Sequence, residues 1–271
     1  MKYIIYSIFI YILFFNKSYA DDMIFYKYAD GNAYSVFVAP SSDKSLSVSA
    51  RDVIAKLIVN FTFMLDNISK DYYNINITKD IVYFGEGVTQ YDIIPVSKDR
   101  FRHIIWIDSQ NNPIKTEIFD NNNKLMIAFS NVDFHGKNKS YEDIKFDFKN
   151  EKPFYKGFYH IYSKIMRNGV NHLIFSDGIN KFSLFIDYNT KDTGSISKIV
   201  YGNYLYSKVI SGVEYTIVGS IPYEIMNEVI EVVSSNNSEV SKLIKAGSKI
   251  SENIFTHTYN TEEIHKWKKS Y

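Results

Sequence analysis

The chain has no cysteine among its 271 residues, and it has only five prolines and twelve glycines. Without cysteine no disulfide can form, so a buried core and hydrogen-bonded sheets must supply the stability. The low proline and glycine content excludes collagen-like and linker-type chains. Neither sign of charge is in excess, because 31 Lys and Arg stand against 30 Asp and Glu. This balance excludes the basic field typical of proteins that bind nucleic acid.

Aromatic residues, in contrast, are abundant, with 23 Tyr and 20 Phe. A disordered chain has low hydrophobicity and few aromatics, so this composition excludes intrinsic disorder. At this length the chain can form one large domain or two small ones, and either can bury a core.

The first twenty residues have the features of a secretory signal peptide. Lys2 gives a positive start, residues 3–15 are almost wholly apolar, and residues 18–20 (Ser-Tyr-Ala) resemble a cleavage site. The apolar run is shorter than the roughly 20 residues of a membrane-spanning helix. We expect cleavage before Asp21 and a soluble exported protein; the alternative is an uncleaved N-terminal anchor.

The pattern of apolar residues predicts an α+β fold that is mostly antiparallel β. Helical spacing at 50–65 and 222–233 predicts two helices. Elsewhere the period is two, and short turn-rich segments separate the stretches, which favours consecutive antiparallel strands in a meander. Strands are expected at 91–96, 102–108, 114–120 and 124–133, and then at 158–166, 172–175, 182–187, 205–210 and 215–218.

A change in composition divides the chain into modules. The polar, charged stretch between the two strand-rich parts is typical of a linker. A third helix, at 238–245, is too short to be stable in water unless it docks. The basic segment around Trp267 is either a mobile end or a contact with a membrane surface or a partner. We expect a signal peptide at 1–20, an N-terminal domain at 21–134, a linker at 135–152, a C-terminal domain at 153–233 and an additional tail at 234–271.

Residue patterns for catalysis or metal binding are hard to find. Ser176, His172 and Asp177 lie within six residues at a strand end and its turn, where a catalytic triad cannot converge; a β-turn explains them better. Six His are scattered without metal-ligand spacing and there is no Cys to join them. We therefore expect no catalytic residues, no metal, no cofactor and no enzymatic activity.

Short motifs in both halves of the chain follow a fixed order. The first half has 91–95 (Tyr-Asp-Ile-Ile-Pro), 98–101 (Lys-Asp-Arg-Phe), 106–108 (Trp-Ile-Asp), 113–115 (Pro-Ile-Lys) and Asp120. The second half has 156–158 (Lys-Gly-Phe), 172–178 (His-Leu-Ile-Phe-Ser-Asp-Gly), 183–186 (Ser-Leu-Phe-Ile) and 218–222 (Val-Gly-Ser-Ile-Pro). Together they resemble the MucB/RseB family, periplasmic regulators of the sigma-E envelope-stress response. Two further motifs usual in that family, Tyr-x-Gly-Thr and Leu-x-Gly-x-x-Arg-Glu, are not visible between residues 21 and 49.

This resemblance implies a fold and a function. The fold would be a LolA-like open half-barrel, shortened by the missing motifs, followed by a smaller β-rich C-terminal domain with a closing helix. The protein would bind the periplasmic domain of an inner-membrane anti-sigma factor of a Gram-negative bacterium and shield it from proteolysis. Lipid A or other acyl chains would release it, by binding only the free form. A homo-oligomer is a further expectation. The alternatives are a periplasmic lipid or lipoprotein carrier of the LolA type, and a secreted virulence or adhesion factor on the same scaffold.

Two sets of residues are candidates for binding. The lipid groove would be lined by the helix face of Val53, Leu57 and Phe61, opposite inward aromatics such as Trp106. The anti-sigma factor would contact outward-facing members of the second-half motifs, with the alternative that all of them are core. These candidates are Phe158, His172, Phe175, Asp177, Phe182 and Phe185.

Overall fold

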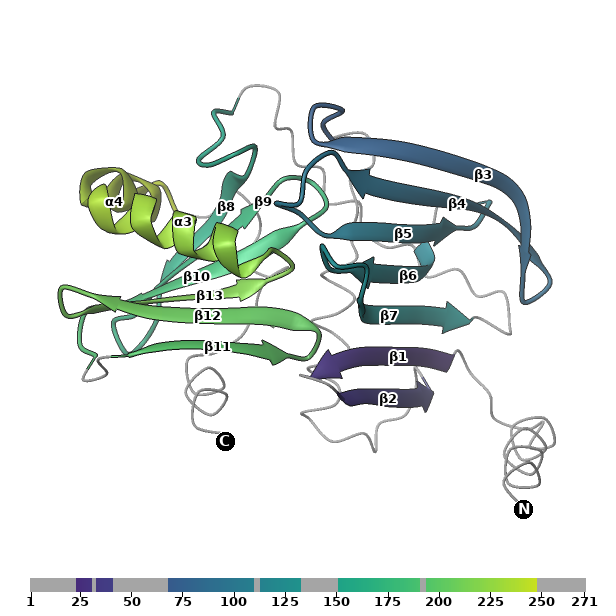
Figure 1. Cartoon of the computed structure of the whole chain (residues 1–271), viewed down its shortest axis with the longest axis horizontal. Coiled ribbons are helices and arrows are strands. Elements are labelled where there is room, and N and C mark those ends of the chain that lie inside the picture. Colours follow the sequence, from purple (N-terminus) through teal and green to yellow (C-terminus); the bar gives the residue numbers. More distant parts are fainter. Residues whose placement is uncertain are drawn as a thin grey trace, which may run out of the picture.

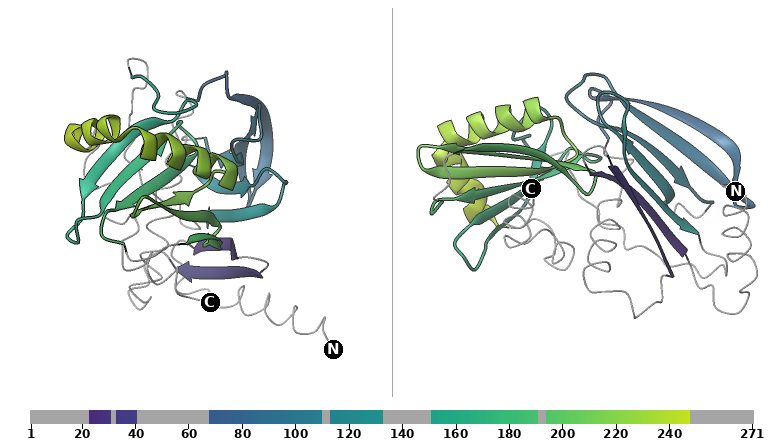
Figure 2. Two further views of the ribbon diagram at one scale, coloured as in Figure 1. Left: turned by 60° about the vertical axis from the view of Figure 1, so that its left-hand side comes forward. Right: turned by 60° about the horizontal axis from the view of Figure 1, so that its bottom comes forward.

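The computed structural model describes residues 23–30, 33–40, 68–109, 113–132, 151–190 and 194–247. In this part of the chain two antiparallel sheets lie side by side, and two helices lie against the second sheet (Figures 1 and 2). Both sheets are open, so the predicted α+β, mostly antiparallel fold is confirmed. No helix of these residues is long and apolar enough to cross a membrane.

The first sheet has seven strands in the order β2-β1-β7-β6-β5-β4-β3. Strands β3 to β7 pair with their neighbours in sequence, which confirms the predicted meander. The hairpin of β1 and β2 joins the sheet through β7. The strands are β1 (Met23–Asp30), β2 (Ala33–Pro40), β3 (Tyr73–Tyr83), β4 (Glu86–Pro95), β5 (Arg102–Ile107), β6 (Pro113–Phe119) and β7 (Leu125–Val132).

Alternation of side chains gives this sheet two different faces. One face carries ion pairs: Arg102 with Asp92 at 2.8 Å, and Lys115 with Glu117 at 2.8 Å. The other, which we call the apolar face, carries residues that the strand register places side by side. They are Ile75, Ile77, Tyr91, Ile93, Ile105, Ile107, Ile118, Ile127 and Phe129.

The second sheet has six strands in the order β11-β12-β13-β10-β9-β8. One of them, β11, was not predicted from the sequence. The strands are β8 (Tyr159–Ile165), β9 (Asn171–Ser176), β10 (Lys181–Asp187), β11 (Ser195–Val200), β12 (Asn203–Ile210) and β13 (Val213–Gly219).

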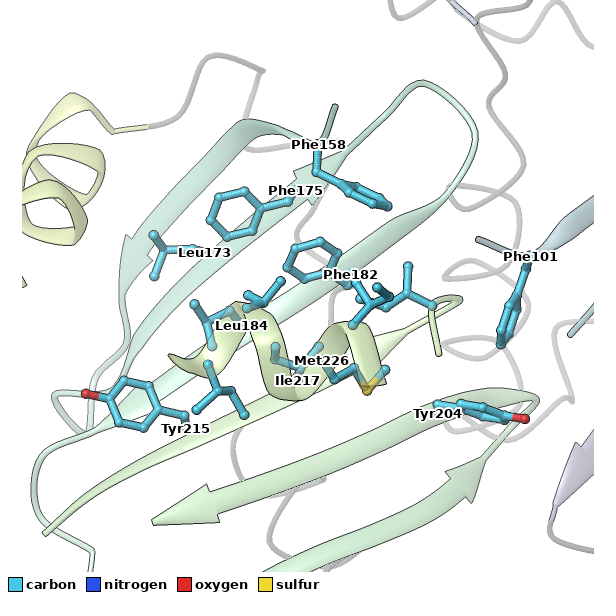
Figure 3. Close-up of a cluster of buried hydrophobic side chains, with 14 of the residues drawn as sticks. Phe101, Phe158, Leu173, Phe175, Phe182, Leu184, Tyr204, Tyr215, Ile217 and Met226 are labelled. Carbon is cyan, nitrogen blue, oxygen red and sulfur yellow. The ribbon is translucent and has the colours of Figure 1, made fainter. Parts of the chain in front are cut away.

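Helix α3 (Tyr223–Ser235) covers one face of the second sheet, close to the predicted range of 222–233. Its buried side chains, among them Met226 and Ile230, pack on the aromatic and aliphatic residues of β9, β10 and β13 (Figure 3). Apolar residues three and four positions apart lie on one side of a helix, so a single stripe forms this contact. The core of the second domain therefore lies between α3 and the sheet.

Helix α4 (Asn237–Ala246) confirms the short helix predicted at 238–245. It packs against β8, where Ser163 Oγ donates a hydrogen bond to the carbonyl oxygen of Leu243 at 3.0 Å. Val240 is buried in the core, so the helix forms because it docks. The predicted signal peptide, the helix at 50–65, nearly all of the linker and the end of the tail lie outside the described residues.

The docking of α4 can be tested by shortening Val240. Val240→Ala removes two buried methyl groups, and we expect the free energy of unfolding to fall by about 2 kcal/mol. Lys242→Ala, on the exposed side of the same helix, should change it little. Urea unfolding of both variants measures the difference; equal values would show that α4 adds nothing to the core.

Candidate functional site

The turn between β9 and β10 inserts a carboxylate between the two sheets. Asp177 is 3% exposed. Its Oδ2 accepts hydrogen bonds from Arg100 Nε at 2.8 Å and from the Tyr73 hydroxyl at 2.6 Å, both of which belong to the first domain. Its Oδ1 accepts from the backbone amides of Ile179 at 3.1 Å and Asn180 at 2.8 Å. A carboxylate with four donors can stay ionised in the interior.

The amide of Asn180 adds a second link to the first sheet. Its Nδ2 donates to the Tyr73 hydroxyl at 2.7 Å and to the carbonyl oxygen of Phe101 at 3.3 Å. Its Oδ1 lies 3.0 Å from His103 Nε2. Because an amide oxygen can only accept, the Nε2 of His103 is the donor. We call this group of Tyr73, Arg100, His103, Asp177 and Asn180 the junction.

Aromatic rings enclose the Arg100 guanidinium. Its Cζ lies 4.1 Å from the centre of the Tyr72 ring and 5.0 Å from that of Phe158, distances suited to cation–π attraction. Arg100 also donates to the carbonyl oxygen of Lys156. Gly157, with φ at +80°, has no room for a side chain, because a Cβ there would lie 2.3 Å from the Tyr72 ring. The 156–158 motif thus lets the two domains approach closely.

A second contact, separate from the junction, joins the two sheets. The amide of Gly202 donates to the carbonyl oxygen of Ala29 on β1 at 2.7 Å, and Tyr204 donates to Asp120 Oδ2 at 2.9 Å. A Cβ at Gly202, where φ is +75°, would lie 2.6 Å from the carbonyl oxygen of Met126. The two sheets are therefore held at two separated points.

In the junction, burial and the charge of the ion-pair partner shift the pKa values of Asp177 and Arg100 in opposite directions. Burial raises the pKa of Asp177, and Arg100 counteracts this shift. Burial lowers the pKa of Arg100, but Asp177, Tyr73 and Asp99 together outweigh it and the net shift is upward. The pKa of Tyr73 is raised well above its usual value by burial and by Asp177. The group therefore consists of one ion pair and a neutral phenol, an arrangement that fixes position.

Comparison with known proteins relates the second domain to a family. Residues 145–234 match the family model described as the MucB/RseB C-terminal domain. The second domain is similar to the C-terminal domain of the MucB/RseB family. The resemblance predicted from the motifs is therefore confirmed for this part of the chain. Proteins of this family are periplasmic regulatory binding proteins, not known as enzymes.

The fold of the whole described chain is similar to that of solved MucB structures. The complex structure of Pseudomonas aeruginosa MucA/MucB matches with a TM-score of 0.51 and 14% identity, over 78% of this chain and 92% of that one. A crystal structure of MucB matches with a TM-score of 0.51 and 14% identity, over 82% and 94%. A shortened first domain was predicted because two family motifs are not visible between residues 21 and 49. The structural match nevertheless extends over most of the length of MucB. No curated protein sequence matches the chain.

The MucB/RseB motif residues singled out for partner binding are all buried. Phe158, Phe175 and Phe182 belong to the core beneath α3 (Figure 3). His172 stacks on Phe185, with ring centres 4.3 Å apart, and Asp177 lies in the junction. Their role in binding stays a prediction; in this structure a partner reaches them only if covering residues move.

The candidate triad does not assemble. Ser176 Oγ donates to the carbonyl oxygen of Asn180 at 3.1 Å, while Asp177 bonds to Arg100 and His172 stacks on Phe185. Ser176 Oγ also accepts from the amide of Gly178 at 3.1 Å, as expected for a turn. Among the described residues no group of three or more His, Asp or Glu could hold a metal ion.

Of the predicted lipid groove, only Trp106 lies within the described residues. Its side chain alternates with those of Ile105 and Ile107 and therefore points away from the apolar face. The Lys115 ammonium covers the ring at 4.0 Å from its centre, and the indole is nearly buried. The role of Trp106 and of Val53, Leu57 and Phe61 in lipid binding stays a prediction.

The junction can be tested by a double-mutant cycle. Arg100→Met and Asp177→Asn each leave a buried polar partner without its counterpart, and we expect each to cost about 3–5 kcal/mol of stability. The double variant should cost less than the sum, because it removes both fully buried charges of the pair together.

A matched control is the exposed pair of Lys156 and Glu228, at 2.7 Å with both side chains nearly half exposed. Glu228→Gln should cost less than about 1 kcal/mol. Denaturant unfolding measures all four variants. Single junction variants no less stable than Glu228→Gln would show that the ion pair does not hold the sheets.

Two buried histidines make stability depend on pH. Burial lowers the pKa of His103 to about 4 and that of His172 to about 3, from a usual value of 6.5. Below pH 6.5 the unfolded chain therefore binds more protons than the folded one. The free energy of unfolding should fall by about 1.4 kcal/mol per pH unit and histidine as the pH drops from 6.5 toward 4. In urea titrations His103→Gln should have a shallower pH dependence than the native chain; an unchanged slope would contradict this assignment.

Proposed function

We propose that the protein binds the periplasmic segment of an inner-membrane anti-sigma factor and shields it from proteolysis. The observation that carries this proposal is the match of residues 145–234 to the MucB/RseB C-terminal domain. The similarity in fold to the MucB of a MucA/MucB complex, over 92% of that chain, supports it. Export to the periplasm after removal of residues 1–20 belongs to the same proposal.

The junction suits such a role because it presents both domains as one platform. A partner segment that contacts both sheets would bind a surface whose two parts are already fixed relative to each other. Less conformational entropy is then lost on binding than if the domains moved independently. Arg100 and Asp177 would act through this placement, since both are buried.

We further propose that acyl chains compete with the anti-sigma segment. The apolar face of the first sheet supports this part, because it continues past the buried Ile93 and Ile105 to Ile77, which is 54% exposed. Exposed apolar surface next to a core is a common feature of binding sites. The same surface favours a second candidate function, a lipid or lipoprotein carrier. A ligand that binds only the free form shifts the equilibrium by its difference in affinity for the two states.

A binding and protection assay tests the proposal. The probe is the periplasmic segment of a candidate single-span anti-sigma factor from the source bacterium, and the control is the same segment with its sequence scrambled. We expect saturable calorimetric binding of the native segment to the chain from Asp21 onward, slower digestion of the bound segment, and loss of both on addition of lipid A.

Three results separate the alternatives. Binding of the segment without an effect of lipid A would remove lipid release alone. Binding of lipid A without binding of the segment would overturn the regulatory function in favour of the carrier. Binding of neither would overturn both.

A further inference from the structure

His103 brings a titratable ring into the junction from the first sheet. The strand register places it between Ile93 on β4 and Ile118 on β6, and the residue is 2% exposed. Its Nε2 donates to Asn180 Oδ1 at 3.0 Å, so in the neutral ring the buried Nδ1 carries no proton. A proton added at Nδ1 would place a full charge in a largely apolar, buried position, which is costly.

The residues that cover His103 come from the second domain. Ile179, in the turn between β9 and β10, is 3% exposed and packs in one cluster with Ile93 and Ile105 of the first sheet. Asn180 follows it and holds the imidazole. If this turn moves away from the first sheet, water reaches His103, and burial no longer opposes its protonation.

The charged groups near His103 favour its neutral form while the junction is closed. The charge of Lys181 on β10 lowers the pKa of His103. Arg100 and Asp177 form an ion pair, and both oxygens of Asp177 already accept hydrogen bonds from other donors. Protonation of Asp177 would also loosen the junction, because Arg100 would lose its partner. The pKa of Tyr73 is raised well above its usual value, so this phenol stays neutral in acid.

We propose that the junction is a pH-sensitive switch, in which protonation of His103 releases residues 177–180 from the first sheet while both domains stay folded. The second contact, which Gly202 and Tyr204 form, is separate from the junction and would keep the domains joined. Helix α3 packs on strands of its own domain, so the core beneath it can stay closed. The proposal does not depend on the anti-sigma function.

The direction of the switch follows from where His103 holds its proton more tightly. In the closed junction, burial and the charge of Lys181 lower its pKa to about 4, whereas its usual value is 6.5. Once water reaches the ring, the pKa returns toward that usual value, so the proton binds the open form more tightly and acid favours opening. From these two pKa values, the ratio of open to closed junctions should rise roughly 20-fold between pH 7 and pH 5.

The test uses the absence of cysteine from the chain. Ile179→Cys places a single thiol in the turn, where it is covered until the junction opens, and Asn76→Cys places one at an exposed position of β3. Each variant is reacted with a dipyridyl disulfide at pH 7 and pH 5, and the released thiopyridone is followed by its absorbance. The ratio of the two rates measures the open fraction, even when that fraction is small. We expect this ratio to rise roughly 20-fold from pH 7 to pH 5.

A third thiol separates opening of the junction from unfolding. Leu184 is fully buried in the core beneath α3 (Figure 3), so Leu184→Cys reacts only when the second domain unfolds. We expect it to react much more slowly than Ile179→Cys at both pH values. Equal rates would show that the turn is exposed only by unfolding, and would overturn the proposal.

Three further variants, each made in the Ile179→Cys chain, assign the response to His103. His103→Gln keeps an amide donor toward Asn180 but does not titrate, and it should lose the rise. His172→Gln removes the buried histidine outside the junction and should keep it. Lys181→Met should weaken the rise, because without that charge the pKa of His103 in the closed junction lies nearer its usual value. Melting temperatures at pH 7 show which variants are folded, and Lys181→Met serves as the test if His103→Gln is not.

Two further results would overturn the proposal. One is a ratio of rates that does not change between pH 7 and pH 5. The other is a rise that is undiminished in folded His103→Gln, or in Lys181→Met, because the response would then belong to another group, with Asp177 the first to examine.

Discussion

The ion pair between Arg100 and Asp177 is the interaction on which the arrangement of the two sheets depends. Each partner is buried, and each comes from a different domain. A buried charge without its counterpart costs several kcal/mol, whereas the pair itself adds little net stability compared with apolar packing. The pair therefore mainly opposes separation of the two sheets. If the sheets move apart, both charges are left poorly solvated until water enters. Tyr73 and Asn180 raise that cost, because their hydrogen bonds cross the same boundary.

The MucB/RseB motifs make physical sense once the junction is known. Arg100 comes from the 98–101 motif, Asp177 from the 172–178 motif and Gly157 from the 156–158 motif, and all three meet at one place. The turn after β9 places its Asp side chain by two backbone amides, and Gly178 takes a φ of +99° that favours glycine there. These motifs, which look unrelated along the chain, together describe how one domain docks on the other.

The sequence predicted local structure well and long-range contacts poorly, for a physical reason. Alternation and helical spacing are local, so most strands and both α3 and α4 were found. Strand β11 was missed because only three of its six residues are apolar, and Ser195, Ser197 and Lys198 interrupt them. The junction could not be predicted, since Arg100 and Asp177 lie 77 positions apart in the sequence and only the tertiary fold brings them together. The candidate aromatics were recognised as a motif, but alternation cannot show burial when both faces of a sheet are covered.

The two sheets differ in what covers them, and this difference separates their roles. In the second domain α3 closes one face and α4 lies against β8, so that domain is a packed body anchored through the junction. In the first domain the apolar face runs out to Ile77, which is 54% exposed on β3, the outermost described strand of the sheet. A ligand of the first domain can therefore contact apolar side chains at the rim of this face without opening a core, whereas the motif residues of the second domain become accessible only if covering residues move.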